Sequence, residues 1–164
     1  MNKATNPAGV APPVGLYSHA VEVPANSRWL YISGQVGIAP DGRLMQGVEA
    51  QTEQACRNII AILEANGMGL ADIVKVTSYL VNLDDLAGFR AARTRAFGQA
   101  KPASTLAVIK SLVGPQYLVE IEAVAAKAVP AARAARPAAS KSPAKKLPTA
   151  KRKASPAKKK ARRR

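Results

Sequence analysis

Two carboxylates in the last apolar run of the chain are the first residues that could do chemistry. Residues 117–126 alternate in polarity, so a β-strand there would place Glu120 and Glu122 on the same face, opposite its apolar side chains. A carboxylate held on a strand can act as a general acid or base toward a bound water. Adjacent acids on a strand are also typical of a solvated face, and the alternation alone does not decide between these roles.

A group of arginines offers the opposite charge. Arg90, Arg93 and Arg95 lie in a segment with helical periodicity. Residues three apart share one face of a helix, so Arg90 and Arg93 can project together while Arg95 diverges. A guanidinium binds a carboxylate through two parallel hydrogen bonds, which would make this face an anion-binding surface. A solvated basic helix face is the alternative, and both interpretations stay open here.

The single histidine and the single cysteine exclude several other chemistries. His19 has no second histidine, cysteine pair or acidic neighbour in sequence, and we expect it on a strand surface. Cys56 falls on the apolar stripe of a helical segment, which favours a core thiol over a nucleophile. Because these two residues can form neither an intramolecular disulfide nor a zinc cluster, we predict no metal and no cofactor.

The elements that must position these residues follow from periodicity and turn signals. Strand-type runs at 16–23 and 28–35 flank a turn-like cluster at 24–27, which predicts a hairpin. From about residue 48 the apolar period becomes helical, and this helix should end near Gly67.

The second half of the chain continues the alternation of strands and helices. The β-branched run at 73–81 indicates a central strand, followed by a helix that begins with Asp84 or Asp85 as N-cap and reaches about residue 97. Two final strands flank a Gly-Pro turn, at 105–112 and 117–126. The predicted order is ββαβαββ, an α+β fold with both helices on one face of the sheet.

The positive charge of the chain is concentrated in its last segment. Residues 1–126 hold ten Lys and Arg and ten Asp and Glu, whereas residues 127–164 hold the other fifteen of the 25 basic residues and no acid. The latter segment is rich in Ala and Pro, and its Ser-Pro-Ala-Lys-Lys repeat, at 142–146 and 155–159, resembles linker-histone tails. We expect one folded domain, 1–126, followed by a disordered basic tail, 127–164.

The tail is expected to bind DNA or RNA without sequence specificity. Separated Lys and Arg clusters suit phosphate neutralisation and counterion release. No aromatic residue follows Tyr117, so the tail cannot stack on single-stranded bases. Contact with an anionic membrane surface and a purely solubilising role are the alternatives.

The location of the protein is predicted from two further features. No stretch approaches the roughly 18 apolar residues of a membrane span, and the N-terminus lacks a continuous apolar signal segment. A cytoplasmic protein without a membrane span is therefore expected, with nucleoid association where the tail meets DNA.

Six short segments, in this order and at this spacing, resemble the Rid (YjgF) family of enamine and imine deaminases. They are Tyr17-Ser18, Ser33-Gly34-Gln35, Gln51 through Ile59, Asp72-Ile73-Val74-Lys75, Pro102-Ala103 and Val119 through Ala125. Any one of them is weak, but six collinear segments agree with the independently derived ββαβαββ order. The resemblance covers about residues 12–126 and leaves the tail outside.

The resemblance implies a chorismate-mutase-like sheet assembled as a homotrimer, with a ligand cleft at each subunit interface. In the family's deaminases an arginine of a Pro-Ala-Arg-Ser motif pairs with the carboxylate of a 2-imino or enamino acid, and a glutamate of the last strand helps water attack the imine carbon. The matched positions here are Ser104 and Glu120. The motif arginine is therefore absent, and a hydroxyl does not replace a bidentate charged group.

The same resemblance assigns roles to the residues around the cleft. The substrate-binding residues it implies are Tyr17, Ser33, Gly34, Arg90, Ser104 and Thr105, with Glu120 as the catalytic acid/base. Arg90 would be a relocated cation, since the second helix of the family often presents a polar residue to the cleft. Structural roles remain open as well: an interface side chain for Tyr17, a strand bulge for Gly34 and a surface charge for Glu120.

Two functions from different classes follow. The first is a hydrolytic deaminase of 2-imino or enamino acids, or a related activity on reactive imine, enamine or carbonyl compounds, altered by the loss of the motif arginine. The alternative is a nucleic-acid-associated protein whose trimeric body displays basic tails without catalysis. A ribonuclease, sometimes proposed for this family, lacks support because the sequence shows no histidine pair and no metal-binding carboxylate cluster.

Overall fold

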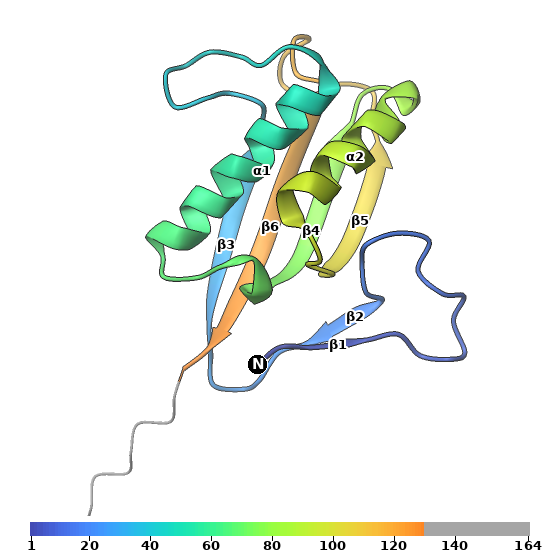
Figure 1. The fold of residues 1–164 in the computed structure, drawn as a ribbon, viewed down its shortest axis with the longest axis vertical. Coiled ribbons are helices and arrows are strands. Elements are labelled where there is room, and N and C mark those ends of the chain that lie inside the picture. Colours follow the sequence, from blue (N-terminus) through green and yellow to red (C-terminus); the bar gives the residue numbers. More distant parts are fainter. Residues whose placement is uncertain (130–164) are drawn as a thin grey trace, which may run out of the picture. The chain divides into compact units, whose positions relative to one another are not determined.

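The computed structural model describes residues 1–129, and the rest of the predicted basic tail lies outside the described residues. A four-stranded mixed sheet forms the centre of the fold (Figure 1), in the order β3-β6-β4-β5. Its strands are β3 (Ser27–Gln35), β6 (Val119–Ala128), β4 (Ile73–Leu80) and β5 (Ala103–Val108). Only β4 and β5 run parallel, while β6 is antiparallel to both of its neighbours.

Two helices cover one face of this sheet, as the sequence predicts. They are α1 (Gly47–Ala65) and α2 (Leu86–Phe97), which lie side by side in front of the strands in Figure 1. Short 3₁₀ turns, η1 (Leu70–Asp72) and η2 (Leu83–Asp85), precede β4 and α2. Asp85 is the N-cap residue of α2, as predicted, but its side chain makes no capping hydrogen bond. Such a bond lies at the start of η2, where the Asn82 side chain accepts from the Asp84 backbone N–H.

The predicted hairpin between residues 16–23 and 28–35 is wrong. Only Ala20–Glu22 forms a strand, β2, and it pairs with the N-terminal strand β1 (Lys3–Thr5) in a separate two-stranded sheet. The first part of the expected strand turns toward β5 instead. Ser18 forms a parallel bridge with Ala103, and its backbone N–H donates to the carbonyl of Pro102 over 3.1 Å. This contact brings residues 14–18 to the edge of the main sheet.

The alternation of β6 separates the two faces of the sheet as expected. Val119, Ile121 and Ala123 are buried under the helices, while Glu120 and Glu122 point the other way. The buried core, which includes the predicted helical stripe of α1, lies between the helices and this face. We call the opposite side, which carries Glu120 and Glu122, the open sheet face.

The entrance to β6 is fixed by one buried glutamine of α1. The side-chain amide of Gln51 donates to the carbonyls of Met45 and Gln116, and its oxygen accepts the Leu118 backbone N–H over 2.9 Å. Because a buried amide with all of these partners has one orientation, Gln51 ties two loops together. The position of Glu120, two residues further on, follows from it.

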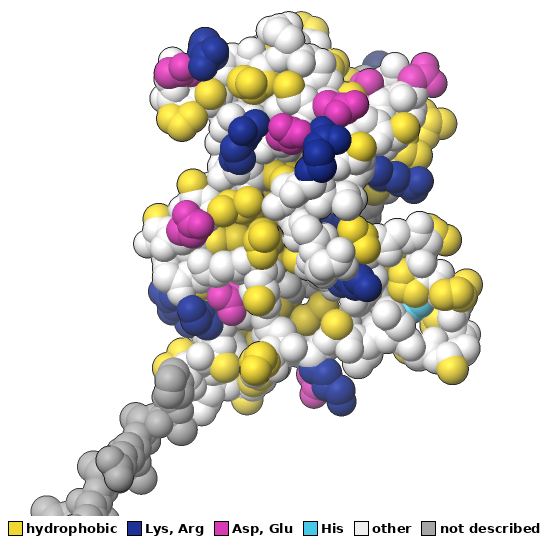
Figure 2. Space-filling model, viewed as in Figure 1, with side chains coloured by type: hydrophobic (Ala, Val, Ile, Leu, Met, Phe, Trp, Pro, Cys, Tyr) yellow, Lys and Arg dark blue, Asp and Glu magenta, His cyan; other side chains and the backbone are white. Residues whose placement is uncertain are grey.

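The surface of the described part carries balanced charge. On the face seen in Figure 2, Lys and Arg side chains lie among Asp and Glu side chains rather than in one basic patch. Arg95 of α2, for example, forms ion pairs of 2.7 Å with both Glu49 and Glu53 of α1. Within residues 1–129, neither helix combines the length and apolarity needed to cross a bilayer.

Candidate active site

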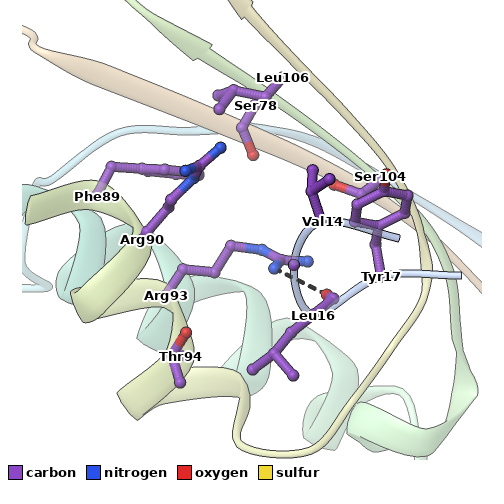
Figure 3. A pocket seen from close by; sticks show the side chains of 11 residues that line it. Val14, Leu16, Tyr17, Ser78, Phe89, Arg90, Arg93, Thr94, Ser104 and Leu106 are labelled. Atoms are coloured by element: carbon purple, nitrogen blue, oxygen red, sulfur yellow. Dashed lines mark hydrogen bonds between the residues drawn. The ribbon is translucent and has the colours of Figure 1, made fainter. Parts of the chain in front are cut away.

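A cavity of about 460 Å³ opens between α2 and the edge of the sheet at β4 and β5 (Figure 3). It is lined by residues of the N-terminal segment (Val14, Gly15, Leu16, Tyr17), β4 (Ser78), α2 (Phe89, Arg90, Arg93, Thr94) and β5 (Ser104, Leu106). We call it the helix-side cavity. Three residues that sequence reasoning assigned to a site, Tyr17, Arg90 and Ser104, meet here.

Arg93 is the most unusual group of this cavity, because it is only 9% exposed yet charged. Its Nη1 donates a hydrogen bond of 3.2 Å to the Leu16 carbonyl, while Nε and Nη2 have no hydrogen-bond partner within residues 1–129. Burial lowers the pKa of the Arg93 guanidinium, although arginine stays charged in proteins. A buried cation without a counter-ion is costly, so the cavity favours an anionic ligand.

The three arginines of α2 divide as their spacing predicts. Arg90 and Arg93 both line the helix-side cavity, and Figure 3 shows Arg93 reaching toward Val14 and Tyr17 while Arg90 extends toward Ser78. Arg95 points to α1 and its carboxylates. Arg90 is exposed and lies at the rim, so the buried cation of the pair is Arg93.

Two hydroxyl groups face the arginines from the sheet. Ser78 of β4 is 1% exposed, and its Oγ has no hydrogen-bond partner in the described part of the chain. Ser104 of β5 pairs in register with Val76, so its side chain lies on the helix-covered face as well. Short hydroxyl side chains leave this end of the cavity open and add hydrogen-bonding capacity for a polar ligand.

Tyr17 reaches the cavity because Ser18 pairs with the edge of β5. Its ring packs edge-on against His19, with centroids 6.1 Å apart and an interplanar angle of 62°. His19 itself does not line the cavity, and its backbone N–H donates to the Asn6 side chain over 2.8 Å. The histidine thus supports the aromatic ring of Tyr17 rather than contributing a second catalytic group to the cavity of this chain.

Glu120, Ser33 and Gly34 gather on the open sheet face, apart from the helix-side cavity. The register between β3 and β6 shifts between Ile32 and Gln35, which makes Ser33-Gly34 a strand bulge. The Glu120 carboxylate lies directly against Gly34, where a Cβ atom would be 1.7 Å from Oε1. Gly34 therefore has a steric reason to be glycine, and it seats the carboxylate of Glu120.

Thr105 also belongs to the open sheet face. It neighbours Ser104 in sequence, and the alternation of β5 turns its side chain away from the helix-side cavity. Lys75 donates to its hydroxyl, with Nζ and Oγ1 2.5 Å apart. A smaller hollow of about 230 Å³ is lined by Ser33, Lys75 and Glu122, among others. One chain therefore separates the predicted residues into two groups on opposite sides of the sheet.

Cys56 is a core residue, as its place on the apolar stripe predicts. It is fully buried, and burial raises the pKa of its thiol to about 12. A thiol that stays protonated at neutral pH is not a nucleophile. The described residues also contain no cluster of three or more His, Cys, Asp or Glu that could hold a metal ion.

Comparisons with known proteins place this arrangement in a family. The family model described as Endoribonuclease L-PSP matches residues 8–127. A RutC family protein of Pyrococcus horikoshii is 41% identical over 117 residues, covering 70% of this chain and 90% of that protein. The chain belongs to the Rid/L-PSP family.

Solved Rid structures and curated relatives agree with this assignment. A Rid family protein of Yersinia pestis matches with a TM-score of 0.68 and 34% identity, over 76% of this chain and 97% of that one. RidA from an Antarctic Psychrobacter matches with a TM-score of 0.56 and 35% identity, over 75% of this chain and 98% of that one. A mouse 2-iminobutanoate/2-iminopropanoate deaminase is 36% identical over 114 residues, covering 68% of this chain and 82% of that protein.

Two groups of the helix-side cavity are not among the site residues predicted from the sequence. Ser78 occupies an inward position in a β-branched strand, and a polar residue at such a position is the signal that could have found it. Arg93 was recognised only as a companion of Arg90. Its burial depends on the path of residues 14–18, which the sequence pattern did not predict.

Proposed function

We propose that this Rid-family chain hydrolyses the imine or enamine of a small 2-oxo acid, and that the substrate lies in the helix-side cavity. The observation that carries the proposal is the charge of the cavity. Its lining contains two arginines, and none of the described residues that line it is an Asp or Glu. The kinship with a 2-iminobutanoate/2-iminopropanoate deaminase supplies the reaction class.

The reaction requires a water, a base and a proton source. The substrate reacts as its protonated imine: the water oxygen bonds to the imine carbon while one water proton passes to a carboxylate, which gives a neutral carbinolamine. The carboxyl group then protonates the amino group, the C–N bond breaks as the C=O bond forms, and the hydroxyl proton passes to the released ammonia, which leaves the 2-oxo acid and ammonium. We assign the proton transfers to Glu120, which takes a proton from the water and returns it to the leaving nitrogen.

Glu120 lies across the sheet from the cavity of its own chain, so the proposed active unit is an assembly. We propose a homotrimer in which Glu120 of one subunit, seated on Gly34, completes the helix-side cavity of its neighbour. The open sheet face supports an assembly because it exposes large aromatic side chains of β3: Trp29 is 48% and Tyr31 is 77% exposed. Exposed aromatic groups on one side of a sheet are typical of a protein interface.

The test is hydrolysis by mixed assemblies of two inactive full-length variants. Glu120→Gln removes the base, and Ser104→Trp fills the cavity. When 2-iminobutanoate is generated in the assay by an amino acid oxidase, each variant alone should be inactive. After co-refolding at equal amounts, about a quarter of the sites in a symmetric trimer would combine an intact cavity with an intact Glu120.

Recovered activity in the mixture would therefore support both the reaction and the shared site. The matched control is the double variant, which carries both Ser104→Trp and Glu120→Gln. Mixed with either single variant, it cannot form a site with an intact cavity and an intact Glu120, so no activity should return. A wild-type protein that does not accelerate hydrolysis would contradict the proposed reaction. Activity in the wild type without recovery in the mixture would contradict only the shared site.

A second candidate function rests on the segregation of charge along the chain. We propose that the segment after residue 129 binds DNA or RNA, since residues 1–129 hold eleven basic and ten acidic residues while residues 130–164 hold fourteen basic residues and no acid. In a trimer, three such segments would act together on one long polyanion and raise its avidity.

Gel-shift titration of duplex DNA with the full chain and with a chain that ends at Val129 tests this function. The shorter chain should lose binding. For the full chain, the logarithm of affinity should fall against the logarithm of salt concentration with a slope of about −0.9 per phosphate neutralised. Equal binding by both chains would contradict the assignment.

A further inference from the structure

We propose that Arg93 is the carboxylate-binding residue of the helix-side cavity, so that α2 supplies the cation that position 104 of β5 lacks. The inference rests on the proposed function for the identity of the substrate. The resemblance to the family implies Arg90 for this role, but Arg90 is exposed, whereas Arg93 is buried.

The free atoms of Arg93 are the ones that a carboxylate needs. Nη1 is held by the Leu16 carbonyl, and the two nitrogens without a partner in residues 1–129 are Nε and Nη2. These two nitrogens form one edge of the planar guanidinium, and a carboxylate can accept two parallel hydrogen bonds from that edge. The bond to Leu16 limits the rotation of the group and leaves this edge unpaired, and because both nitrogens are buried, a ligand must displace the atoms that cover them in order to bind there.

Arg95, on the same helix, provides a comparison because its charge is paired by carboxylates of the protein. Two residues further along, it contacts Glu49 and Glu53 of α1 and remains half exposed. Arg93 is more buried, yet no carboxylate within the described residues lies within ion-pair distance of it. The ring of Phe97, whose centroid is 5.6 Å from Cζ of Arg93, offsets part of the cost of burying this cation, and we assign the missing counter-ion to the ligand.

The rest of the cavity fits a 2-imino or 2-oxo acid bound in this way. Ser104 is short, so position 104 does not compete with the Arg93 guanidinium for space. Ser78 offers an unpartnered hydroxyl to a polar group beside the carboxylate, and Leu106 and Phe89 provide apolar walls for a carbon chain. An arginine at position 104 would instead add a third guanidinium group to a cavity that Arg90 and Arg93 already line.

Binding of 2-oxobutanoate, the product of the proposed reaction, tests the role of Arg93 in the full-length protein. Titration followed by NMR or calorimetry should show that Arg93→Gln weakens binding by about 30-fold or more, the loss expected for a charge-assisted pair. Butanone, which has the same chain without the carboxylate, should bind both proteins equally. Arg95→Gln, on the same helix, is the matched control and should stay within about twofold of the wild type.

A more specific test places an arginine at position 104 of β5 and asks whether affinity for 2-oxobutanoate returns. Ser104→Arg in the Arg93→Gln background should recover a substantial part of the lost affinity, while Ser104→Arg alone should weaken binding because a third large side chain then takes space that the ligand needs beside Arg93. Should Arg93→Gln fail to fold, Arg93→Lys keeps the charge but lacks the second donor of the edge, and it should bind 2-oxobutanoate several-fold more weakly.

Equal affinity of the wild type, Arg93→Gln and Arg93→Lys for 2-oxobutanoate would overturn the inference. The outcome is distinct from a failure of the proposed function. If Arg93→Gln hydrolyses 2-iminobutanoate with an unchanged KM, Arg93 does not bind the substrate, but the proposed hydrolysis stands. If 2-oxobutanoate binding depends on Arg93 but the protein has no hydrolytic activity, the anion site stands and the proposed reaction is contradicted.

Discussion

The two faces of the central sheet carry complementary chemistry. On the helix-covered side, Arg93 and Ser78 present polar atoms that have no partner within residues 1–129. On the open sheet face, Glu120 is seated against Gly34 with Glu122 beside it on the same strand. The guanidinium of Arg93, on α2, and the carboxylate of Glu120, on β6, thus lie on opposite sides of the same sheet.

Under the proposed function, each of these two groups of residues is half of an active site. Each half is well formed: the guanidinium is fixed by Leu16, and the carboxylate is fixed by the strand bulge at Gly34. The sheet separates the two within one chain, because Arg93 belongs to the helix layer and the Glu120 side chain points to the opposite face of β6. The proposed reaction therefore requires Arg93 of one subunit and Glu120 of a neighbouring subunit to face the same substrate.

The largest expected effect is that of removing the base from the open sheet face. Glu120→Gln should lower kcat for 2-iminobutanoate hydrolysis by about 10²- to 10⁴-fold, the usual contribution of general acid–base catalysis. The affinity for 2-oxobutanoate should change little, because the carboxylate-binding group lies in the other half-site. Steady-state kinetics and a binding titration on the same preparation separate these two quantities.

Glu122→Gln is the matched control for this prediction. Glu122 shares the strand and the face of Glu120, but it is not the carboxylate seated on Gly34. Its substitution should leave kcat within about threefold of the wild type, as expected for a surface charge. An equal loss of kcat in both variants would mean that the charge of the open sheet face matters, and not one positioned carboxylate.

A smaller effect is expected when the seat of the carboxylate changes. In Gly34→Ala the new Cβ would lie 1.7 Å from Oε1 of Glu120, so the carboxylate must swing away. The atom that moves is the end of a flexible side chain, and we expect a loss of folding stability below about 1 kcal/mol. A displaced base should nevertheless lower kcat by roughly 10- to 100-fold.

Thermal unfolding and kinetics on Gly34→Ala distinguish these two quantities, and Gly69→Ala is the control. A Cβ at Gly69 meets no atom within 4 Å, so this variant should keep its activity. Full activity in Gly34→Ala would show that Glu120 need not occupy its observed position, and it would weaken the assignment of the base.

Much of the fold could be predicted because periodicity reports burial directly. The stripe of α1, the alternation of β6 and the β-branched β4 each bury the residues that their pattern indicates. The pairing of residues 16–23 could not be predicted in this way. Strand-type composition does not indicate which strand a segment will pair with. Here residues 20–22 pair with β1, and Ser18 pairs with the edge of β5.

The candidate site could be predicted only in part for the same reason. Spacing correctly separated Arg95 from Arg90 and Arg93, since position on a helix is a local property. It could not tell which arginine is buried, because that depends on the distant carbonyl of Leu16. Similarly, Ser104 and Thr105 are neighbours in one motif, and the strand sends them to opposite faces.

The smallest expected effect concerns the exclusion of water from the helix-covered side of the sheet, which the pH dependence of folding stability reports through Cys56. Burial raises the pKa of the Cys56 thiol from its ordinary 9.0 to about 12, so the folded protein keeps this thiol neutral where the unfolded chain ionises it. The unfolded state therefore loses more protons above pH 9, and the free energy of unfolding should fall as the pH rises from about 9 toward 12. At pH 10 the wild type should lose about 1 kcal/mol more, relative to pH 7, than Cys56→Ala.

Urea unfolding of both proteins at pH 7 and pH 10 measures this difference, and their shared Tyr and Lys residues cancel in the comparison. The same desolvation lowers the pKa of Arg93. A wild type and a Cys56→Ala variant with identical pH dependence would mean that water reaches this side of the sheet. The unpaired edge of the Arg93 guanidinium could then be satisfied by solvent, and the contrast between the two faces would be smaller than the folded chain indicates.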